Sequence, residues 1–78
     1  MDDATAFRRL LRLMRVGYKF MHAEGTECVF LEHPRGRRFA QWRLMLYDNG
    51  TLVGMGEMRI KAADDTAFDA FLSTVPKP

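Results

Sequence analysis

The chain has 78 residues, of which 47% are hydrophobic and 28% charged, with 12 Lys and Arg against 10 Asp and Glu. This length predicts one small globular domain, residues 1–78, with little room for a deep active-site cleft. The net charge of +2 is too small for the whole molecule to act as a polyanion binder, so any basic function has to come from local clusters.

The sequence carries no signal for secretion or membrane insertion. Cys28 is the single cysteine, which excludes an internal disulfide. The first residues lack the basic region and apolar stretch of a signal peptide, and no apolar run approaches the length of a membrane span. We therefore expect a cytoplasmic protein without a membrane partner.

The segment from Asp3 to about Val16 has the periodicity of an amphipathic helix. Six apolar side chains fall on one arc that is expected to pack on the rest of the protein: Ala6, Phe7, Leu10, Leu11, Leu13 and Met14. Beside this arc, guanidinium groups line up at i, i+4 and i+7, formed by Arg8, Arg12 and Arg15, with Arg9 nearby.

Gly17 leaves two interpretations of the next segment. If Gly17 ends the helix in the left-handed conformation, residues 18–22 form a strand, Gly25 turns the chain at positive φ, and residues 27–33 form the returning strand. If the helix continues to Gly25, Tyr18 and Met21 extend its apolar arc. The aromatic and β-branched residues of the segment, and the cost of glycine inside a helix, favour the hairpin.

A basic loop and a second hairpin follow. The loop "HPRGRR", residues 33–38, carries Arg35, Arg37 and Arg38, and Pro34 and Gly36 explain it as a turn. Asn49-Gly50 between two alternating runs then predicts a type I′ turn that pairs Asp48 with Thr51.

This register assigns the side chains of the hairpin to two faces. One face receives Trp42, Leu44, Leu46, Val53 and Met55. The other face receives Met45, Tyr47, Leu52, Met58 and Ile60, together with Gln41 and Arg43. Gly54 and Gly56 fall opposite Met45 and Arg43, where they predict a bend, a bulge or a close approach of other atoms.

Residues 64–75 form a short C-terminal helix that Pro76 ends. Thr66 followed by Asp69 resembles a capping box, and the buried stripe consists of Ala67, Phe68, Phe71, Leu72 and Val75. The predicted fold is therefore α+β: an N-terminal helix, a three- or four-stranded antiparallel sheet of hairpins, and a C-terminal helix on the same sheet face, in the order αβββα or αββββα.

Catalytic and metal-binding residue patterns are missing from the sequence. In the hairpin interpretation His22 and Cys28 are diagonal neighbours, but a lone strand cysteine is more often a small buried hydrophobe than a nucleophile. No CxxC, HxxxH or carboxylate cluster has ligand spacing, and Asp64 and Asp65 are explained by helix capping and the helix dipole. We expect no enzyme activity, no metal and no cofactor.

The passage "GMGEMRIKAADDTAFDAFL" and the order of elements resemble the double-stranded-RNA-binding domain. That family grips phosphates with lysines at the start of its last helix, whereas this sequence has Asp64 and Asp65 there and Lys61 before them. The resemblance is one of topology and implies no transfer of RNA-binding residues.

Two functions remain. The first is a non-catalytic adaptor or inhibitor that docks on a larger protein, or self-associates as a homodimer, through an apolar, Met-rich sheet face. The second is a nucleic-acid module that holds RNA or DNA phosphates with the two arginine groups. The candidate binding residues are Arg8, Arg12, Arg15, Arg35, Arg37, Arg38, Arg43, Met45, Tyr47 and Leu52.

Overall fold

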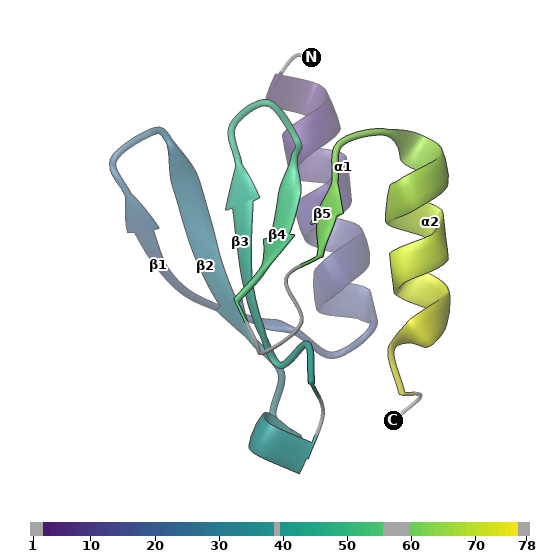
Figure 1. The fold of residues 1–78 in the computed structure, drawn as a ribbon. Coiled ribbons are helices and arrows are strands. Elements are labelled where there is room, and N and C mark those ends of the chain that lie inside the picture. Colours follow the sequence, from purple (N-terminus) through teal and green to yellow (C-terminus); the bar gives the residue numbers. More distant parts are fainter. Residues whose placement is uncertain (1–2, 39, 56–59, 77–78) are drawn as a thin grey trace.

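The computed structural model describes residues 3–38, 40–55 and 60–76, except for the side chains of Asp3 and Arg37. A helix α1 (Asp3–Arg15) precedes a hairpin of strands β1 (Lys19–Glu24) and β2 (Cys28–Glu32). A 3-10 turn η1 (Gly36–Arg38), strands β3 (Arg43–Tyr47), β4 (Leu52–Gly54) and β5 (Lys61–Ala62), and helix α2 (Asp65–Thr74) complete the chain. The strands form an antiparallel meander in the order β1-β2-β3-β4-β5 (Figure 1).

The predicted α+β fold is confirmed, with five strands in place of three or four. Both helices contribute to one hydrophobic core on one face of the sheet. Side chains that are direct partners across the strands supply the sheet half of this core: Leu31, Leu44, Leu46, Leu52 and Ala62. Leu13 of α1 and Phe68 and Phe71 of α2 supply the other half. We call this the helix side of the sheet and the opposite side the open face.

Gly17 ends α1, so the hairpin interpretation of residues 18–33 is correct. Gly17 has a φ of 110°, which strongly favours glycine. The backbone N–H groups of Gly17 and Tyr18 donate to the carbonyl oxygens of Met14 and Leu13, both at 3.1 Å, which is a Schellman motif. The chain then enters β1, and a turn with Gly25 at a φ of 54° leads into β2.

The register predicted for the second hairpin was wrong by one residue. Thr51 lies opposite Tyr47, and the loop has three residues that end in Gly50, with a φ of 88°. The side-chain oxygen of Asn49 accepts from the N–H of Thr51 at 2.9 Å and stabilises this longer turn. Because side chains alternate along a strand, the shift moves Leu52 to the helix side and Val53 to the open face.

The shift also changes the environment of Gly54 and Ile60. Gly54 lies opposite Leu44, and a Cβ atom there would meet Gln41 and the side chain of Ile60. The expected close approach of other atoms to this glycine is therefore confirmed, with different neighbours. Ile60 had been predicted to lie on the same face as Met45 and Tyr47; this was wrong, because Ile60 packs against the core. Gly56 and Met58 lie outside the described residues.

The C-terminal helix α2 begins two residues earlier than a Thr66 cap would place it. Asp64 is the N-cap, and its carboxylate accepts from the N–H of Ala67 at 2.8 Å. The predicted stripe of α2 is confirmed, with Phe68, Phe71 and Val75 buried. Neither of the two described α-helices has the length and the continuous apolar surface that spanning a membrane requires.

Candidate protein-binding surface

Helix α1 buries a different line of residues from the one its apolar arc predicts. Leu13 and Arg9 are buried, at 0% and 4% exposure. Phe7, Leu11 and Met14 are 59%, 39% and 46% exposed, although the sequence predicted that they pack on the core. Their spacing of i, i+4 and i+7 puts them along one line of the helix. We call these three residues the α1 stripe.

Arg9 lies on the buried side of α1, and its guanidinium enters the protein interior. Its Nη1 donates to the carbonyl oxygens of Gly50 at 2.6 Å and Ala63 at 3.4 Å, and its Nη2 donates to Oδ1 of Asp65 at 2.7 Å. The hydrogen bond and charge of Arg9 lower the pKa of Asp65. The ion pair with Arg9 therefore gives Asp65 a structural role. The sequence had suggested only helix capping and a favourable interaction with the helix dipole for this residue.

The predicted line of guanidinium groups is divided between two roles. Arg12 forms an ion pair with Asp69 at 2.7 Å and lies over the ring of Phe68, so it contributes to the contact between the two helices. Arg8 and Arg15 are exposed, and Arg8 donates to the hydroxyl of Thr5 at 3.2 Å. Arg8 and Arg15 each follow a residue of the α1 stripe by one position, so they lie along one side of it.

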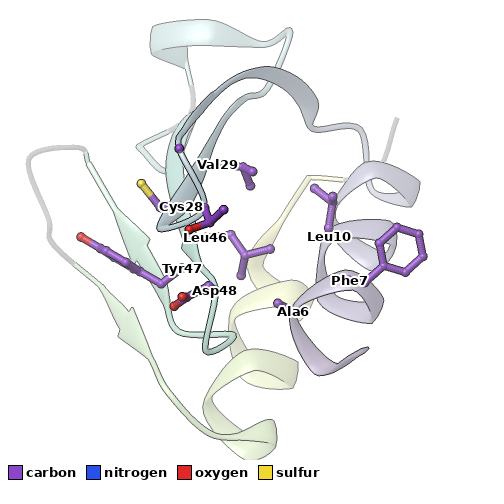
Figure 2. Close-up of a pocket in the computed structure, with 10 residues that line it drawn as sticks. Ala6, Phe7, Leu10, Cys28, Val29, Leu46, Tyr47 and Asp48 are labelled. Atoms are coloured by element: carbon purple, nitrogen blue, oxygen red, sulfur yellow. The ribbon is translucent and has the colours of Figure 1, made fainter. Parts of the chain in front are cut away.

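An apolar hollow of about 260 Å³ lies between α1 and the β1–β2 hairpin. Ala6, Phe7 and Leu10 form its wall on the helix, and Val29 and Leu46 are among the residues that line it from the sheet. Figure 2 shows Leu10, Val29 and Leu46 between the helix and the strands, whereas Cys28 and Tyr47 point toward the open face. Because Phe7 belongs to both, the hollow and the α1 stripe form one continuous apolar surface.

Strand β1 extends the exposed apolar surface at the edge of the sheet. All six of its residues are exposed, and Phe20 and Met21 are 48% and 50% accessible. Phe20 pairs with the core residue Leu31, so it lies on the helix side of the sheet. The β1–β2 hairpin projects beyond the part of the sheet that the helices cover (Figure 1).

The open face carries part of the predicted Met-rich surface. Met45 and Tyr47 lie there as predicted and are half-buried, but Leu52 is fully buried in the core, so its assignment to this surface was wrong. The rings of His22 and Phe30 stack at 4.5 Å. Arg43 pairs with Glu32 at 3.3 Å and lies over the ring of Trp42.

The basic loop begins beside the end of α1. His33 is buried, and its Nε2 lies 3.2 Å from the carbonyl oxygen of Val16, while its Nδ1 accepts from the N–H of Arg35 at 3.2 Å. Arg35 and Arg38 are exposed and, with Pro34, line an open hollow of about 640 Å³. The side chain of Arg37 lies outside those described.

The two arginine groups approach each other at one end only. The contact between His33 and Val16 brings the start of the loop to the end of α1 that carries Arg15. Arg8 lies about 10 Å farther along the helix axis, because each residue adds about 1.5 Å. Arg15 therefore lies at the same end of the molecule as Arg35 and Arg38, whereas Arg8 lies toward the other end of α1.

Cys28 and His22, the side chains with catalytic potential, lie on the adjacent strands β2 and β1. Burial, and then the charges of Glu24, Glu27 and Asp48, raise the pKa of Cys28, which disfavours the thiolate that a nucleophile needs. His22 contacts Phe30 and lies 3.5 Å from Glu24. Within residues 3–38, 40–55 and 60–76, no three His, Cys, Asp or Glu side chains form a group that could hold a metal ion.

Sequence analysis missed the role of Arg9 and the exposure of β1. Arg9 lies on the same helix face as Leu13, and this position could have indicated its role. An arginine on a helix face that packs on the core needs a partner for its charge, which predicts a buried ion pair. The charged residues at the two ends of β1, Lys19 and Glu24, were a signal for a solvent-exposed strand.

Comparisons of the chain with protein-family models, curated proteins and solved structures found no match.

Proposed function

We propose that this protein is a non-catalytic binding module that docks on a larger protein through the α1 stripe. The observation that carries the proposal is the orientation of α1, which exposes Phe7, Leu11 and Met14 while Arg9 occupies the interior. A helix with apolar side chains at i, i+4 and i+7 matches the way an amphipathic helix occupies a hydrophobic groove.

The charges around the stripe indicate the chemistry of the partner. Arg8 and Arg15 are exposed beside the apolar line. Arginine is enriched at protein interfaces and forms bidentate contacts with carboxylates. We therefore infer an apolar groove on the partner with acidic residues along its rim, and Phe7 would bring the adjacent hollow into the same interface.

The test is the capture of a partner followed by measurement with purified proteins. The full chain is immobilised and exposed to an extract of the organism that encodes it, and the retained protein is purified for titration calorimetry. We expect Leu11→Ser to weaken binding by at least about tenfold, because a central apolar side chain is lost from the interface. Arg15→Ser should weaken binding and reduce its salt dependence.

Thr66→Ser on α2 is the control, because it changes an exposed residue away from the stripe. This variant should bind like the wild type. A partner whose affinity is the same for the wild type and Leu11→Ser would contradict the proposal, as would the absence of any retained protein.

A second candidate is a nucleic-acid module based on Arg15, Arg35 and Arg38. The observation that favours it is the open hollow lined by Arg35 and Arg38 near the end of α1. Fluorescence anisotropy with short RNA and DNA duplexes and single strands at about 50 mM salt tests it, because phosphate contacts are strongest at low salt. The double variant Arg35→Ser and Arg38→Ser should lose binding, whereas Arg8→Ser should keep it; no binding to any of the probes would eliminate this candidate.

A further inference from the structure

The two edges of the sheet differ in how well they are protected. β5 forms one edge and has two residues, whereas β1 forms the other and has six, all of them exposed. Within the described part of the chain, β1 pairs only with β2. A long exposed edge strand presents backbone N–H and C=O groups to any second strand, and natural proteins usually shorten or cover such an edge.

A β-bulge makes the distribution of the β1 side chains between the two sheet faces symmetric about the middle of the strand. Lys19 and Glu24 pair with Glu32 and Cys28, which puts both end residues on the open face. Phe20 and Ala23 pair with Leu31 and Val29 and lie on the helix side.

Strict alternation over six residues would instead place the first and last residues on opposite faces. The irregularity between Phe20 and His22 removes this mismatch, and Met21 and His22 both line a hollow on the open face. From Lys19 to Glu24 the order is open, helix side, open, open, helix side, open, which is the same in both directions.

We propose that β1 pairs antiparallel with β1 of a second copy, about a two-fold axis between Met21 and His22. Residues directly opposite each other in an antiparallel pair lie on the same face of the sheet, and the symmetric order satisfies this condition at all six positions. Lys19 then lies opposite Glu24 of the second copy, and Phe20 opposite its Ala23. Each of these pairs occurs twice in the dimer.

The charges and the sizes of the β1 side chains both favour a second copy of this chain as the strand that pairs with the β1 edge. The antiparallel pairing places opposite charges together at both ends of the strand, whereas a parallel pairing would bring Lys19 close to its own equivalent. A large ring lies against a small methyl group at the Phe20 and Ala23 positions. The α1 stripe is not used, so the dimer goes beyond the proposed function and does not depend on it.

The test measures the association of full-length variants by sedimentation equilibrium from about 1 μM to about 500 μM, the range in which weak dimers form. Lys19→Glu alone and Glu24→Lys alone each place like charges opposite one another at two positions. We expect each single variant to dimerise about tenfold more weakly than the wild type.

Combining the two substitutions distinguishes the antiparallel β1–β1 pairing from other ways in which the chain could dimerise. An equimolar mixture of Lys19→Glu and Glu24→Lys chains should form a heterodimer, because every opposed pair is then attractive. The double variant Lys19→Glu and Glu24→Lys in one chain should recover the wild-type affinity. Lys61→Glu, the same charge change on the opposite edge, is the control and should leave association unchanged.

Three results would overturn the proposal: a monomer at every concentration, a dimer that ignores both single variants, or single variants that are not rescued by mixing. Leu11→Ser should dimerise like the wild type, and Lys19→Glu should bind the partner of the α1 stripe like the wild type. Failure of the dimer and failure of the proposed function are therefore read from different variants.

Discussion

Arg9 and Asp65 form an ion pair with a buried cation and an exposed anion. Nη2 of Arg9 lies 2.7 Å from Oδ1 of Asp65, and the two side chains are 4% and 87% exposed. The guanidinium of Arg9 also donates to the carbonyl oxygens of Gly50 and Ala63. One side chain therefore joins α1 to the β3–β4 turn and to the start of α2.

We predict that Arg9→Met destabilises the fold by about 2–4 kcal/mol, because the buried carbonyl oxygen of Gly50 loses its donor and the contact with Asp65 disappears. Urea unfolding followed by circular dichroism measures the change. Arg8→Met is the matched control on the exposed side of α1 and should stay within about 0.5 kcal/mol of the wild type. Equal effects of the two substitutions would contradict the interior role of Arg9.

Acid should weaken the fold through Asp65. The hydrogen bond and charge of Arg9 lower the pKa of Asp65 from its ordinary value of 3.8. A carboxyl group with a lowered pKa in the folded state stabilises the fold above its unfolded pKa, and this contribution is lost as the pH falls through the folded pKa. The loss therefore begins near pH 3.8 and continues below it.

Asp65→Asn tests this contribution, because the amide keeps the shape of the side chain and does not titrate. We expect the variant to be less stable than the wild type at neutral pH and to lose less stability on acidification. Urea unfolding between about pH 7 and about pH 2 measures both curves. Curves that run parallel throughout this range would show that Arg9 does not act on Asp65.

Gly17 and Gly25 provide a matched pair of glycine substitutions. Both have positive φ, at 110° and 54°, but a Cβ atom at Gly17 would lie 2.7 Å from Nε2 of His33, whereas nothing lies within 4 Å of a Cβ atom at Gly25. We predict that Gly25→Ala costs about 1 kcal/mol through backbone strain and that Gly17→Ala costs at least about 2 kcal/mol.

Thermal and urea unfolding of both variants measure the difference. In a His33→Ala background, the added cost of Gly17→Ala should fall to about that of Gly25→Ala, because the colliding ring is gone. If the extra cost persists without His33, then the ring contact is not its source.

The α1 stripe should contribute little to the stability of the monomer. Phe7→Ser and Met14→Ser should each change the free energy of unfolding by no more than about 0.5 kcal/mol, because both side chains are about half exposed. Leu13 precedes Met14 and is buried. Leu13→Ala should therefore lower the free energy of unfolding by about 2–5 kcal/mol. A loss of more than about 2 kcal/mol in Phe7→Ser would assign the stripe to folding and remove its support as a binding surface.

Periodicity and glycine positions were enough to predict the order of the elements. Apolar residues at helical spacing marked both helices, and Gly17 and Gly25 marked the first hairpin. The sequence could not predict the orientation of α1, because an amphipathic arc shows which residues are apolar and not which of them the sheet has room to cover. Arg9 and Leu13 take the buried line of α1, so Phe7, Leu11 and Met14 remain exposed.

The error at Leu52 has a local cause. Asn49-Gly50 is compatible with a two-residue and with a three-residue turn, and the two differ by one position in the pairing of the strands. The hydrogen bond from the N–H of Thr51 to the side chain of Asn49 stabilises the longer turn. Sequence periodicity gave no means to choose between them, because both faces of this hairpin carry apolar residues.

The contacts of Arg9 also have a consequence for biosynthesis. The guanidinium donates to Gly50, Ala63 and Asp65, which lie 41, 54 and 56 residues farther along the chain. A nascent chain therefore completes the Arg9 site only after Asp65 has emerged from the ribosome, when nearly the whole domain has been made. Helix α1 is synthesised before the strands and α2, yet its native docking depends on the start of α2, so the domain is expected to fold in one step once α2 has emerged.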